Sequence, residues 1–325
     1  MTRFLVTGGA GFIGSHLVQR LVRDGHDVTV LDDFSSGDRE NLAGVADRIR
    51  VIEGSITDAN ACRDAMRGAT YVLHHAAMAS VPASMADPAR ANAVNAGGTV
   101  CLLEAARASG VARFVNVSTC ALYGDDPVLP KTEAMISKPL SPYAASKAAA
   151  ELFSDMYHRA FGLQTVSLRY FNVFGARQSA ESDYAAVIPK FIRAAVMNES
   201  PIIFGDGEQT RDFIHVDNVV EANLLACTAT HVTGPFNMGS GTRTSVNSLW
   251  HQIKQMTGTS VEPRYESGHP GEVRDSVCSL ERSHALLGYR QVTSFEAGLR
   301  STIEFHRQGL AHEMARPVGR LTVGG

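Results

Sequence analysis

The sequence predicts an α/β protein built on a doubly wound parallel sheet, with a smaller and less regular C-terminal part. Short apolar runs alternate with helical patterns through the first half of the chain. A glycine-rich turn joins the first apolar run to the first helical pattern. After about residue 175, segments punctuated by glycine and proline replace this alternation. Strands that alternate with helices pair in parallel through right-handed crossovers, which is why the first half indicates this sheet.

The expected elements follow one another in a regular order. Apolar runs of strand length occur at residues 4–6, 28–31, 51–52, 71–74, 114–117 and 165–170. Stretches with a helical pattern fall between some of these runs, at residues 12–24, 92–109 and 144–161. This succession is typical of β-α-β units and a parallel sheet.

The composition is that of a soluble globular protein. Of 325 residues, 44% are hydrophobic and 19% charged, and the formal net charge is −3. A protein devoted to nucleic acid would need a basic face, so no nucleic-acid partner is expected. Five cysteines are dispersed without metal-ligand spacing, and no apolar run has the length of a membrane helix. We therefore expect a cytoplasmic protein with reduced thiols, no metal and no membrane contact.

The glycine-rich turn has the spacing of a dinucleotide-binding loop. Gly8, Gly11 and Gly14 stand between the first strand and the first helix. In such a loop one glycine makes a tight turn, one admits a diphosphate, and one lets the helix pack on the strand. The helix N-terminus then offers unpaired N–H groups to the phosphates. Asp32 ends the next strand with no Arg or Lys beside it, which favours NAD over NADP because a carboxylate there binds the ribose hydroxyls.

A tyrosine and a lysine one helical turn apart form a second candidate group. Tyr143 and Lys147 share a helix face. A phenol is a poor base at neutral pH, but a nearby ammonium and the positive nicotinamide ring lower its pKa. Thr119 ends a predicted strand, and open parallel sheets bind ligands beyond the carboxyl ends of their strands. Hydroxyl, phenol and amine would then provide a proton path for oxidising a sugar alcohol.

These features divide the chain into three segments. Residues 1–175 are expected to form the NAD-binding domain, with the catalytic tyrosine and lysine. Residues 176–310 are expected to be mainly the substrate-binding part, from which the chain is free to return to the main sheet. Residues 311–325 show no clear period and are expected to be a poorly ordered tail.

Motifs across residues 3–290 resemble those of the extended short-chain dehydrogenase/reductase family, in particular its NAD-dependent nucleotide-sugar 4-epimerases. The motifs are TGGAGFIGSHL at 7–17, LHHAA at 73–77, SVPASMADP at 80–88, NAGGT at 95–99, LYGD at 122–125, SPYAASK at 141–147, RYFNVFG at 169–175 and GDGEQTRDFIHVDN at 205–218. The resemblance implies a Rossmann-like fold, the cofactor NAD and a UDP-sugar substrate. It also implies a homodimer, formed by packing the helices at 92–109 and 144–161 into a four-helix bundle.

The resemblance also assigns roles to single residues. It implies that Tyr143 is the general base, Lys147 its electrostatic partner, and Thr119 the hydroxyl that hydrogen-bonds the 4-OH of the sugar. The implied cofactor contacts are Gly8, Gly11, Phe12, Ile13, Gly14, Asp32, Asp33, Ala76, Ala77, Tyr143 and Lys147. The implied substrate contacts are Ser80, Thr119, Asn172, Val187, Arg211, Arg274 and Ser276, of which Asn172, Arg211 and Arg274 would contact the diphosphate.

Departures from the family pattern narrow the reaction. Ser55 stands where many members carry Asp near the adenine, and His269 where a phosphate-binding Arg is common. Related 4,6-dehydratases need an Asp-Glu pair after the catalytic hydroxyl, and related decarboxylases a similar acid, but this chain has Cys120 and Ala121. We interpret Cys120 as a small buried filler next to the cofactor. The chemistry that needs only Thr, Tyr, Lys and NAD is 4-epimerisation through a transient 4-keto sugar.

A small residue in the implied sugar pocket indicates the substrate. Ser276 falls where 4-epimerases carry either a bulky Tyr or a small residue, and a small one leaves room for an N-acetyl group at C2. We therefore expect UDP-GlcNAc and UDP-GalNAc as substrates, with UDP-Glc and UDP-Gal also accepted. A UDP-glucuronate 4-epimerase, a nucleotide-sugar dehydratase and a non-catalytic NAD-binding scaffold stay open as alternatives.

Overall fold

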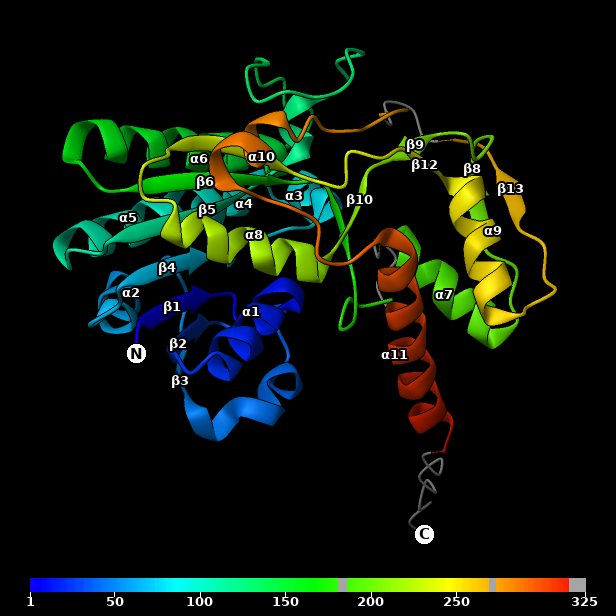
Figure 1. The fold of residues 1–325 in the computed structure, drawn as a ribbon, viewed down its shortest axis with the longest axis horizontal. Helices are drawn as coiled ribbons and strands as arrows, with labels where there is room; N and C mark the ends of the chain where they lie inside the picture. The colour runs from blue at the N-terminus through cyan, green and yellow to red at the C-terminus, as the bar shows by residue number, and fades with distance from the viewer. Residues whose placement is uncertain (181–185, 269–272, 316–325) are drawn as a thin grey trace, which may run out of the picture.

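A parallel sheet forms the centre of the molecule in the computed structural model, which describes residues 1–180, 186–268 and 273–315, with side chains up to residue 310. In the described chain the sheet has seven strands in the order β11-β6-β5-β4-β1-β2-β3, all paired in parallel (Figure 1). The strands are β1 (Arg3–Thr7), β2 (Asp27–Asp32), β3 (Ile49–Glu53), β4 (Tyr71–His74), β5 (Arg113–Thr119), β6 (Thr165–Tyr170) and β11 (Gly234–Met238). The predicted doubly wound parallel sheet is confirmed.

Helices cover both faces of this sheet, because alternate strand residues point to opposite sides. Val6 and Val30 pack on one face with α1 (Phe12–Arg23), η1 (Arg39–Arg48) and α8 (Val216–Thr228). Leu5 and Leu31 pack on the other face, where the covering helices are α2 (Ala59–Met66), α5 (Gly98–Ala108) and α6 (Pro142–Phe161). Both layers are fully buried cores, which explains why the strands read as continuous apolar runs.

The predicted helix at residues 92–109 is more complex than its pattern suggested. The helical stretch starts earlier, as α3 (Val81–Ala86) and α4 (Pro88–Asn92), and a π-turn, η2 (Ala93–Gly97), leads into α5. Asn95 lies in the π-turn, and its side-chain amide is buried. The amide oxygen accepts a hydrogen bond from the Met78 N–H at 2.8 Å, and the amide nitrogen donates to the Ser146 hydroxyl at 2.9 Å. This stretch is thereby fixed to the start of α6.

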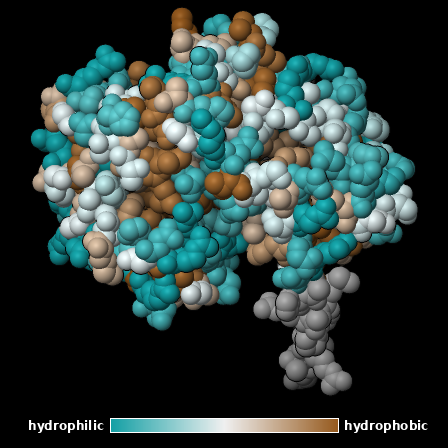
Figure 2. All heavy atoms as spheres, viewed as in Figure 1, coloured by the Kyte–Doolittle hydropathy of each residue, from teal (hydrophilic) through white to brown (hydrophobic). Residues whose placement is uncertain are grey.

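A smaller part with its own core stands beside the sheet (Figure 1). Its core is formed mainly by α7 (Val187–Met197), α9 (Val246–Thr257) and α11 (Phe295–Ala315). Short two-stranded sheets accompany these helices: β7 (Asn172–Phe174) with β10 (Phe213–His215), β9 (Thr210–Arg211) with β12 (Thr244–Ser245), and β8 (Ile202–Phe204) with β13 (Arg264–Glu266). Figure 2 shows the two parts as adjoining masses whose surface intersperses polar and apolar residues.

The chain does return to the main sheet from the segment 176–310. Helix α8 covers the sheet, β11 pairs with β6, and α10 (Glu281–Leu287) packs near β11. Arg113 of β5 is fully buried and ties down the connection, since Nε donates to the Ala226 carbonyl at 3.0 Å and Nη2 to the Val232 carbonyl at 2.6 Å. The sheet therefore contains residues from both halves of the chain.

The C-terminal segment is helical at its start. Helix α11 continues to Ala315, and thus five residues into the expected tail, while residues 316–325 lie outside the described residues. His269, one of the departures from the family pattern, lies outside the described residues as well. Within the described ranges no helix is long and apolar enough to cross a membrane, and no cluster of three or more potential metal ligands occurs.

Candidate active site

The glycine loop is held tightly against the ends of β1, β2 and β4. Gly8 has a φ of +67°, which favours glycine, and its N–H donates to the Leu31 carbonyl at 2.8 Å. A Cβ on Gly8 would lie 2.6 Å from the backbone nitrogen of Ala76, and one on Gly14 would lie 2.1 Å from the Gly8 carbonyl oxygen. Any side chain at these two positions would clash with the neighbouring backbone, so the fold itself requires glycine there.

Gly11 differs from its two companions. Apart from its neighbours in the chain, the one described atom within 4 Å of a Cβ placed there is the Gly8 carbonyl oxygen, at 3.2 Å. Gly11 caps α1 and offers no side-chain hydrogen bond to the first helical turn, so the N–H groups of Phe12 and Ile13 can bind an anion. The Phe12 ring lies at Gly175, 3.5 Å from a Cβ built there, so we expect a backbone contact from Phe12 to the cofactor. An open position at a helix N-terminus fits the diphosphate of NAD.

Asp32 is oriented for the adenosine ribose at the end of β2. The side chain is 7% exposed; Oδ2 accepts from the Ala10 N–H at 2.8 Å and Oδ1 from the Phe34 N–H at 2.9 Å. Burial raises the pKa of Asp32, and these two hydrogen bonds oppose that effect. Asp33 is exposed and accepts from the Ser35 N–H, so the structure orients Asp32 more firmly than Asp33.

The fold brings an arginine into this region that no motif indicated. The guanidinium of Arg39 lies 3.9 Å from the centre of the Phe34 ring, and it forms an ion pair with Glu53. Because that pair balances its charge, Arg39 does not oppose the preference for NAD inferred from Asp32. The contact depends on η1 folding back over the loop after β2, which a local pattern does not reveal.

The segment after β4 connects the cofactor loop to the catalytic helix. The N–H of Ala76 donates to the Thr7 hydroxyl at 3.2 Å, and Ala76 and Ala77 are partly buried there. Ser80 caps α3, its hydroxyl oxygen accepting from the Ala83 N–H at 3.1 Å. One turn later, the Ser84 hydroxyl accepts from the N–H of Tyr143 at 3.1 Å.

Thr119 and Tyr143 are brought together as predicted from strand end and helix start. Thr119 ends β5 and caps η3 (Cys120–Tyr123), accepting from the Ala121 N–H at 3.1 Å. Ser141 and Pro142 start α6, and Tyr143 follows in its first turn, where its side chain hydrogen-bonds Thr119. Burial raises the pKa of Tyr143 to about 12, and the Thr119 hydrogen bond opposes this only in part. Desolvation of the phenolate dominates in the chain by itself, and the expected lowering, which also involves the nicotinamide ring, stays a prediction for the enzyme with bound cofactor.

Lys147 supplies the positive charge beneath this pair. It lies one turn after Tyr143 on α6 and is 2% exposed. Burial lowers the pKa of Lys147 to about 8, with Glu151 acting in the opposite direction, so the amine is mainly protonated at neutral pH. Burial also keeps two histidines near it neutral: the pKa of His75 falls to about 3, and that of His74 lies well below its usual value.

Arg211 and Asn172 reach the same end of the sheet from the smaller part. Both the N–H and the side-chain amide of Asn172 donate to the Asp212 carbonyl, at 3.0 and 3.2 Å. Arg211 donates through Nη1 to the Thr210 and Arg274 carbonyls, each at 3.0 Å. Burial raises the pKa of Cys120 to about 12, and the positive charge of Arg211 opposes this effect. The Arg211 guanidinium therefore lies near Cys120, the residue after Thr119.

The remaining predicted contacts lie along β9 and at the start of α7. The Ser276 N–H donates to the Thr210 carbonyl at 3.1 Å, so the segment with Ser276 runs beside Arg211. Arg274 is exposed and forms an ion pair with Asp206 at 2.9 Å, which would have to open for a phosphate contact. Val187 begins α7 and packs against the core of the smaller part.

Asp212 organises this side of the site, although the sequence motif was read only for its arginine. It is fully buried, and its carboxylate accepts from the N–H groups of Ser240 at 2.6 Å, Gly241 at 3.0 Å and Cys278 at 3.1 Å. It thereby holds the segment of Ser276 against β9 and β10. Asp212 lies between β9 and β10, beside Arg211 and Phe213, and the polar residues before it in the sequence gave no signal of burial.

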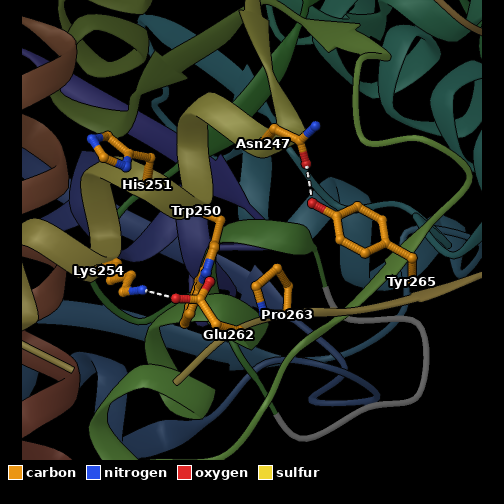
Figure 3. A pocket seen from close by; sticks show the side chains of 7 residues that line it. All are labelled: Asn247, Trp250, His251, Lys254, Glu262, Pro263 and Tyr265. Carbon is orange, nitrogen blue, oxygen red and sulfur yellow. Dashed lines mark hydrogen bonds and ion pairs between the residues drawn. The ribbon is translucent and has the colours of Figure 1, made fainter. Parts of the chain in front are cut away.

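A surface cavity of about 310 Å³ lies apart from these residues (Figure 3). Its lining comes from α9, the segment before β13, and β13 itself. It includes the Lys254–Glu262 ion pair and the Tyr265 hydroxyl, which donates to Asn247 at 3.0 Å. None of the predicted site residues lines it. It is therefore separate from the candidate active site.

Comparison with known proteins identifies the family. A family model described as the NAD dependent epimerase/dehydratase family matches residues 4–239. The chain belongs to this family. It is an NAD-dependent enzyme, in agreement with the open glycine loop and the oriented Asp32.

Similar proteins cover nearly the whole chain. UDP-glucose 4-epimerase from Mycolicibacterium smegmatis is 38% identical over 309 residues, which are 94% of this chain and 98% of that protein. The structure of UDP-N-acetylglucosamine 4-epimerase from Methanobrevibacter ruminantium, in complex with UDP-N-acetylmuramic acid, is 37% identical, with a TM-score of 0.91 and 95% and 99% of the two chains covered. UDP-glucose 4-epimerase from Thermus thermophilus, in complex with NAD, is 35% identical, with a TM-score of 0.85 and coverage of 94% and 99%.

Proposed function

We propose that the enzyme is a 4-epimerase of UDP-sugars, with UDP-GlcNAc and UDP-GalNAc as its main substrates and UDP-Glc and UDP-Gal as further ones. Similarity to UDP-sugar 4-epimerases along nearly the whole chain supports the reaction. The choice of 4-epimerisation over dehydration rests on one observation, which is that no acid-base pair follows Thr119. Ala121 has no ionisable group, and the Cys120 thiol, with a pKa of about 12, stays protonated. Dehydration would need a base at this place.

The chain's own residues account for the proton transfer. Tyr143 takes the proton of the sugar 4-OH and later returns it, while Thr119 hydrogen-bonds both the phenol and the sugar oxygen. Lys147 favours the phenolate through its charge. The glycine loop and Asp32 would hold NAD, which would supply hydride transfer at C4 of the sugar. Asn172 and Arg211 hold the diphosphate about which the sugar turns.

The N-acetyl preference rests on Ser276. Its side chain is small, and its backbone is fixed beside β9 by the hydrogen bond to Thr210 and by the anchoring of the next residues to Asp212. A small residue at a fixed place leaves volume for a substituent at C2 of the sugar. The similarity to a UDP-N-acetylglucosamine 4-epimerase is consistent with this preference.

We also infer a homodimer formed through α5 and α6. Helix α6 exposes a row of large apolar side chains, among them Leu152 at 71% and Phe161 at 51%. Contiguous apolar surface on a helix of a soluble protein indicates a partner face. A second copy of the chain that packs α5 and α6 against the same helices would bury it in a four-helix bundle.

The test is to incubate the purified protein with UDP-GlcNAc, without added cofactor, and to follow the sugar protons by NMR. Growth of UDP-GalNAc signals supports 4-epimerisation, retained NAD and an N-acetyl-tolerant pocket together. Conversion of only UDP-Glc or UDP-glucuronate would keep the reaction and overturn the interpretation of Ser276. A 4-keto or unsaturated product would identify a dehydratase, and retained NAD without any turnover would identify a scaffold.

A further inference from the structure

The turn that follows β7 packs against the start of helix α1. The ring of Phe12, the first residue of α1, lies at Gly175. One helical turn later, Nε2 of His16 donates to the Ala176 carbonyl at 2.8 Å. Arg177 is the next residue of the turn, so it lies beside the first turns of α1, the helix whose open N-terminus fits the diphosphate of NAD.

The backbone of Arg177 is strained. Its φ is +66°, in the left-handed region that residues with a Cβ rarely adopt. Within the described ranges, Phe34 and Asn198 are the other non-glycine residues with a positive φ. Asn198 caps the end of α7, which is a common use of this conformation, and Phe34 directly follows the acidic pair at residues 32–33, on the adenosine side of the cofactor site. Strained backbone of this kind clusters at binding sites, which makes Arg177 a candidate.

The guanidinium of Arg177 has no counter-charge in the part of the chain that the structure describes. It is partly buried, its Nε is buried without a hydrogen-bond acceptor, and burial lowers its pKa without an opposing acidic group. The neighbouring His16 is neutral, because burial and the charge of Arg177 lower its pKa to about 4. Asp217, which also acts on His16, contacts His215 at 3.4 Å instead. A partly buried cation without a partner is unfavourable, and this indicates a bound anion.

We propose that Arg177 is a cofactor-binding residue, whose guanidinium donates to a diphosphate oxygen of NAD together with the N–H groups at the start of α1. A guanidinium and the N-terminus of a helix both suit phosphate oxygens, and the two lie side by side here. Binding supplies the missing negative charge and offsets the strain at residue 177. The inference rests on the NAD dependence of the enzyme and not on the sugar that it converts.

Arg177→Gln tests the contact through the rate at which NAD leaves the holoenzyme. Protein loaded with isotope-labelled NAD is mixed with an excess of unlabelled NAD, and the bound label is followed in time. Release should be about 10- to 100-fold faster in the variant, as for the loss of a charge-assisted hydrogen bond. Arg20→Gln is the matched control, because it removes the same charge from α1 at a guanidinium that already pairs with Asp24 and Glu221. It should release NAD at the wild-type rate.

Arg177→Gly separates the side chain from the backbone. Glycine adopts a positive φ without strain, so this variant without NAD should unfold at or above the wild-type temperature. It should nevertheless release NAD as fast as Arg177→Gln does. A lower unfolding temperature with an unchanged release of NAD would show that Arg177 is only structural, and would overturn the proposal.

UDP distinguishes the cofactor diphosphate from that of the substrate. The dissociation constant of UDP, measured by calorimetry on the NAD-loaded protein, should be the same in Arg177→Gln and the wild type. Weaker UDP binding with an unchanged release of NAD would assign Arg177 to the substrate and refute the cofactor contact. NAD release needs no turnover, so a wild type that converts none of the UDP-sugars contradicts the proposed function alone.

A conservative variant covers the case in which Arg177→Gln does not fold. Arg177→Lys keeps the positive charge but loses the planar group of donors, so it should release NAD at a rate between those of the wild type and Arg177→Gly. A wild-type rate in both Arg177→Lys and Arg177→Gly excludes a contact from Arg177 to NAD.

Discussion

Thr119, Tyr143 and Lys147 meet because two local rules place them. A residue that ends a central parallel strand lies at the ligand edge of the sheet, and residues four apart share a helix face. The structure accordingly brings Thr119 and Tyr143 into hydrogen-bond contact above Lys147. Local spacing was enough for this part of the site.

Contacts between distant segments were not predictable in this way. Asp212 binds the backbone of Cys278, and Arg274 pairs with Asp206, across more than sixty residues in each case. No spacing signals such contacts, since they depend on how the smaller part folds against the sheet. The motif QTRDF indicated Arg211 but gave no reason to place Asp212 at the centre of a hydrogen-bond cluster.

At the scale of one residue, Ser276→Tyr should change the substrate preference. The larger side chain fills the volume assigned to the N-acetyl group, so UDP-GlcNAc turnover should fall by about 10- to 100-fold, in the range of a steric change in a binding pocket. UDP-Glc turnover should change much less. The measurement is the ratio of kcat/KM for the two substrates, with Ser276→Ala as control, and a ratio equal to that of the wild type would show that Ser276 does not line the sugar pocket.

At the scale of an element, the two outer glycines of the loop serve the fold and the middle one the cofactor. Gly14→Ala would place a Cβ 2.1 Å from the Gly8 carbonyl, so α1 must shift, and the free energy of unfolding should drop by about 3 kcal/mol or more. Gly11→Ala meets the same oxygen at 3.2 Å and should keep the fold while losing bound NAD. Thermal unfolding and the absorbance of released NAD distinguish the two, and equal destabilisation by both variants would contradict this division.

Helix α6 allows a test of the oligomeric state. Leu152→Glu places a charge in the exposed apolar row, so burial of that row against a second copy becomes unfavourable. Analytical ultracentrifugation should show a dimer for the wild type and a monomer for this variant. Ile136→Glu, at an apolar side chain that is 80% exposed outside α5 and α6, is the control and should stay a dimer. A dimer that survives Leu152→Glu would place the interface elsewhere.

Elements with clear periodicity were predicted and the shortest ones were not. The strands of residues 1–170 and helix α6 match their expected positions closely, and of the strands all but the edge strand β3 bury apolar residues in the two core layers. Strands β8, β9, β12 and β13 have two or three residues each, too few to show an alternating pattern. The π-turn of η2 interrupts a helical pattern without changing its polarity, so the sequence showed one helix there.

For the molecule as a whole, buried neutral histidines should make the fold sensitive to acid. The pKa of His75 is about 3 in the folded chain against 6.5 when unfolded, so the unfolded state takes up a proton first as the pH falls. The stability present above pH 6.5 is therefore lost on the way to pH 3, at about 1.4 kcal/mol per pH unit for one histidine. Urea unfolding at pH 7, 6 and 5 measures this slope.

Two variants assign the slope to the buried ring. His75→Gln should reduce the loss of stability between pH 7 and pH 5, since it removes the group that titrates differently in the two states. His231→Gln, at an exposed position, should leave the slope as in the wild type. Identical slopes in His75→Gln and the wild type would show that His75 does not stay neutral in the fold.

The sheet is finished late in the chain, and this has a consequence for biosynthesis. Residues 234–238 form β11, which covers the outer edge of β6, and the connection before β11 provides the Val232 carbonyl to which buried Arg113 donates. A ribosome that adds about 5–20 residues per second needs roughly 3–14 seconds to proceed from the end of β6 to the end of β11. Throughout that interval the edge of β6 is unpaired in the nascent chain. A chaperone that recognises unpaired strand edges would bind the chain during this interval.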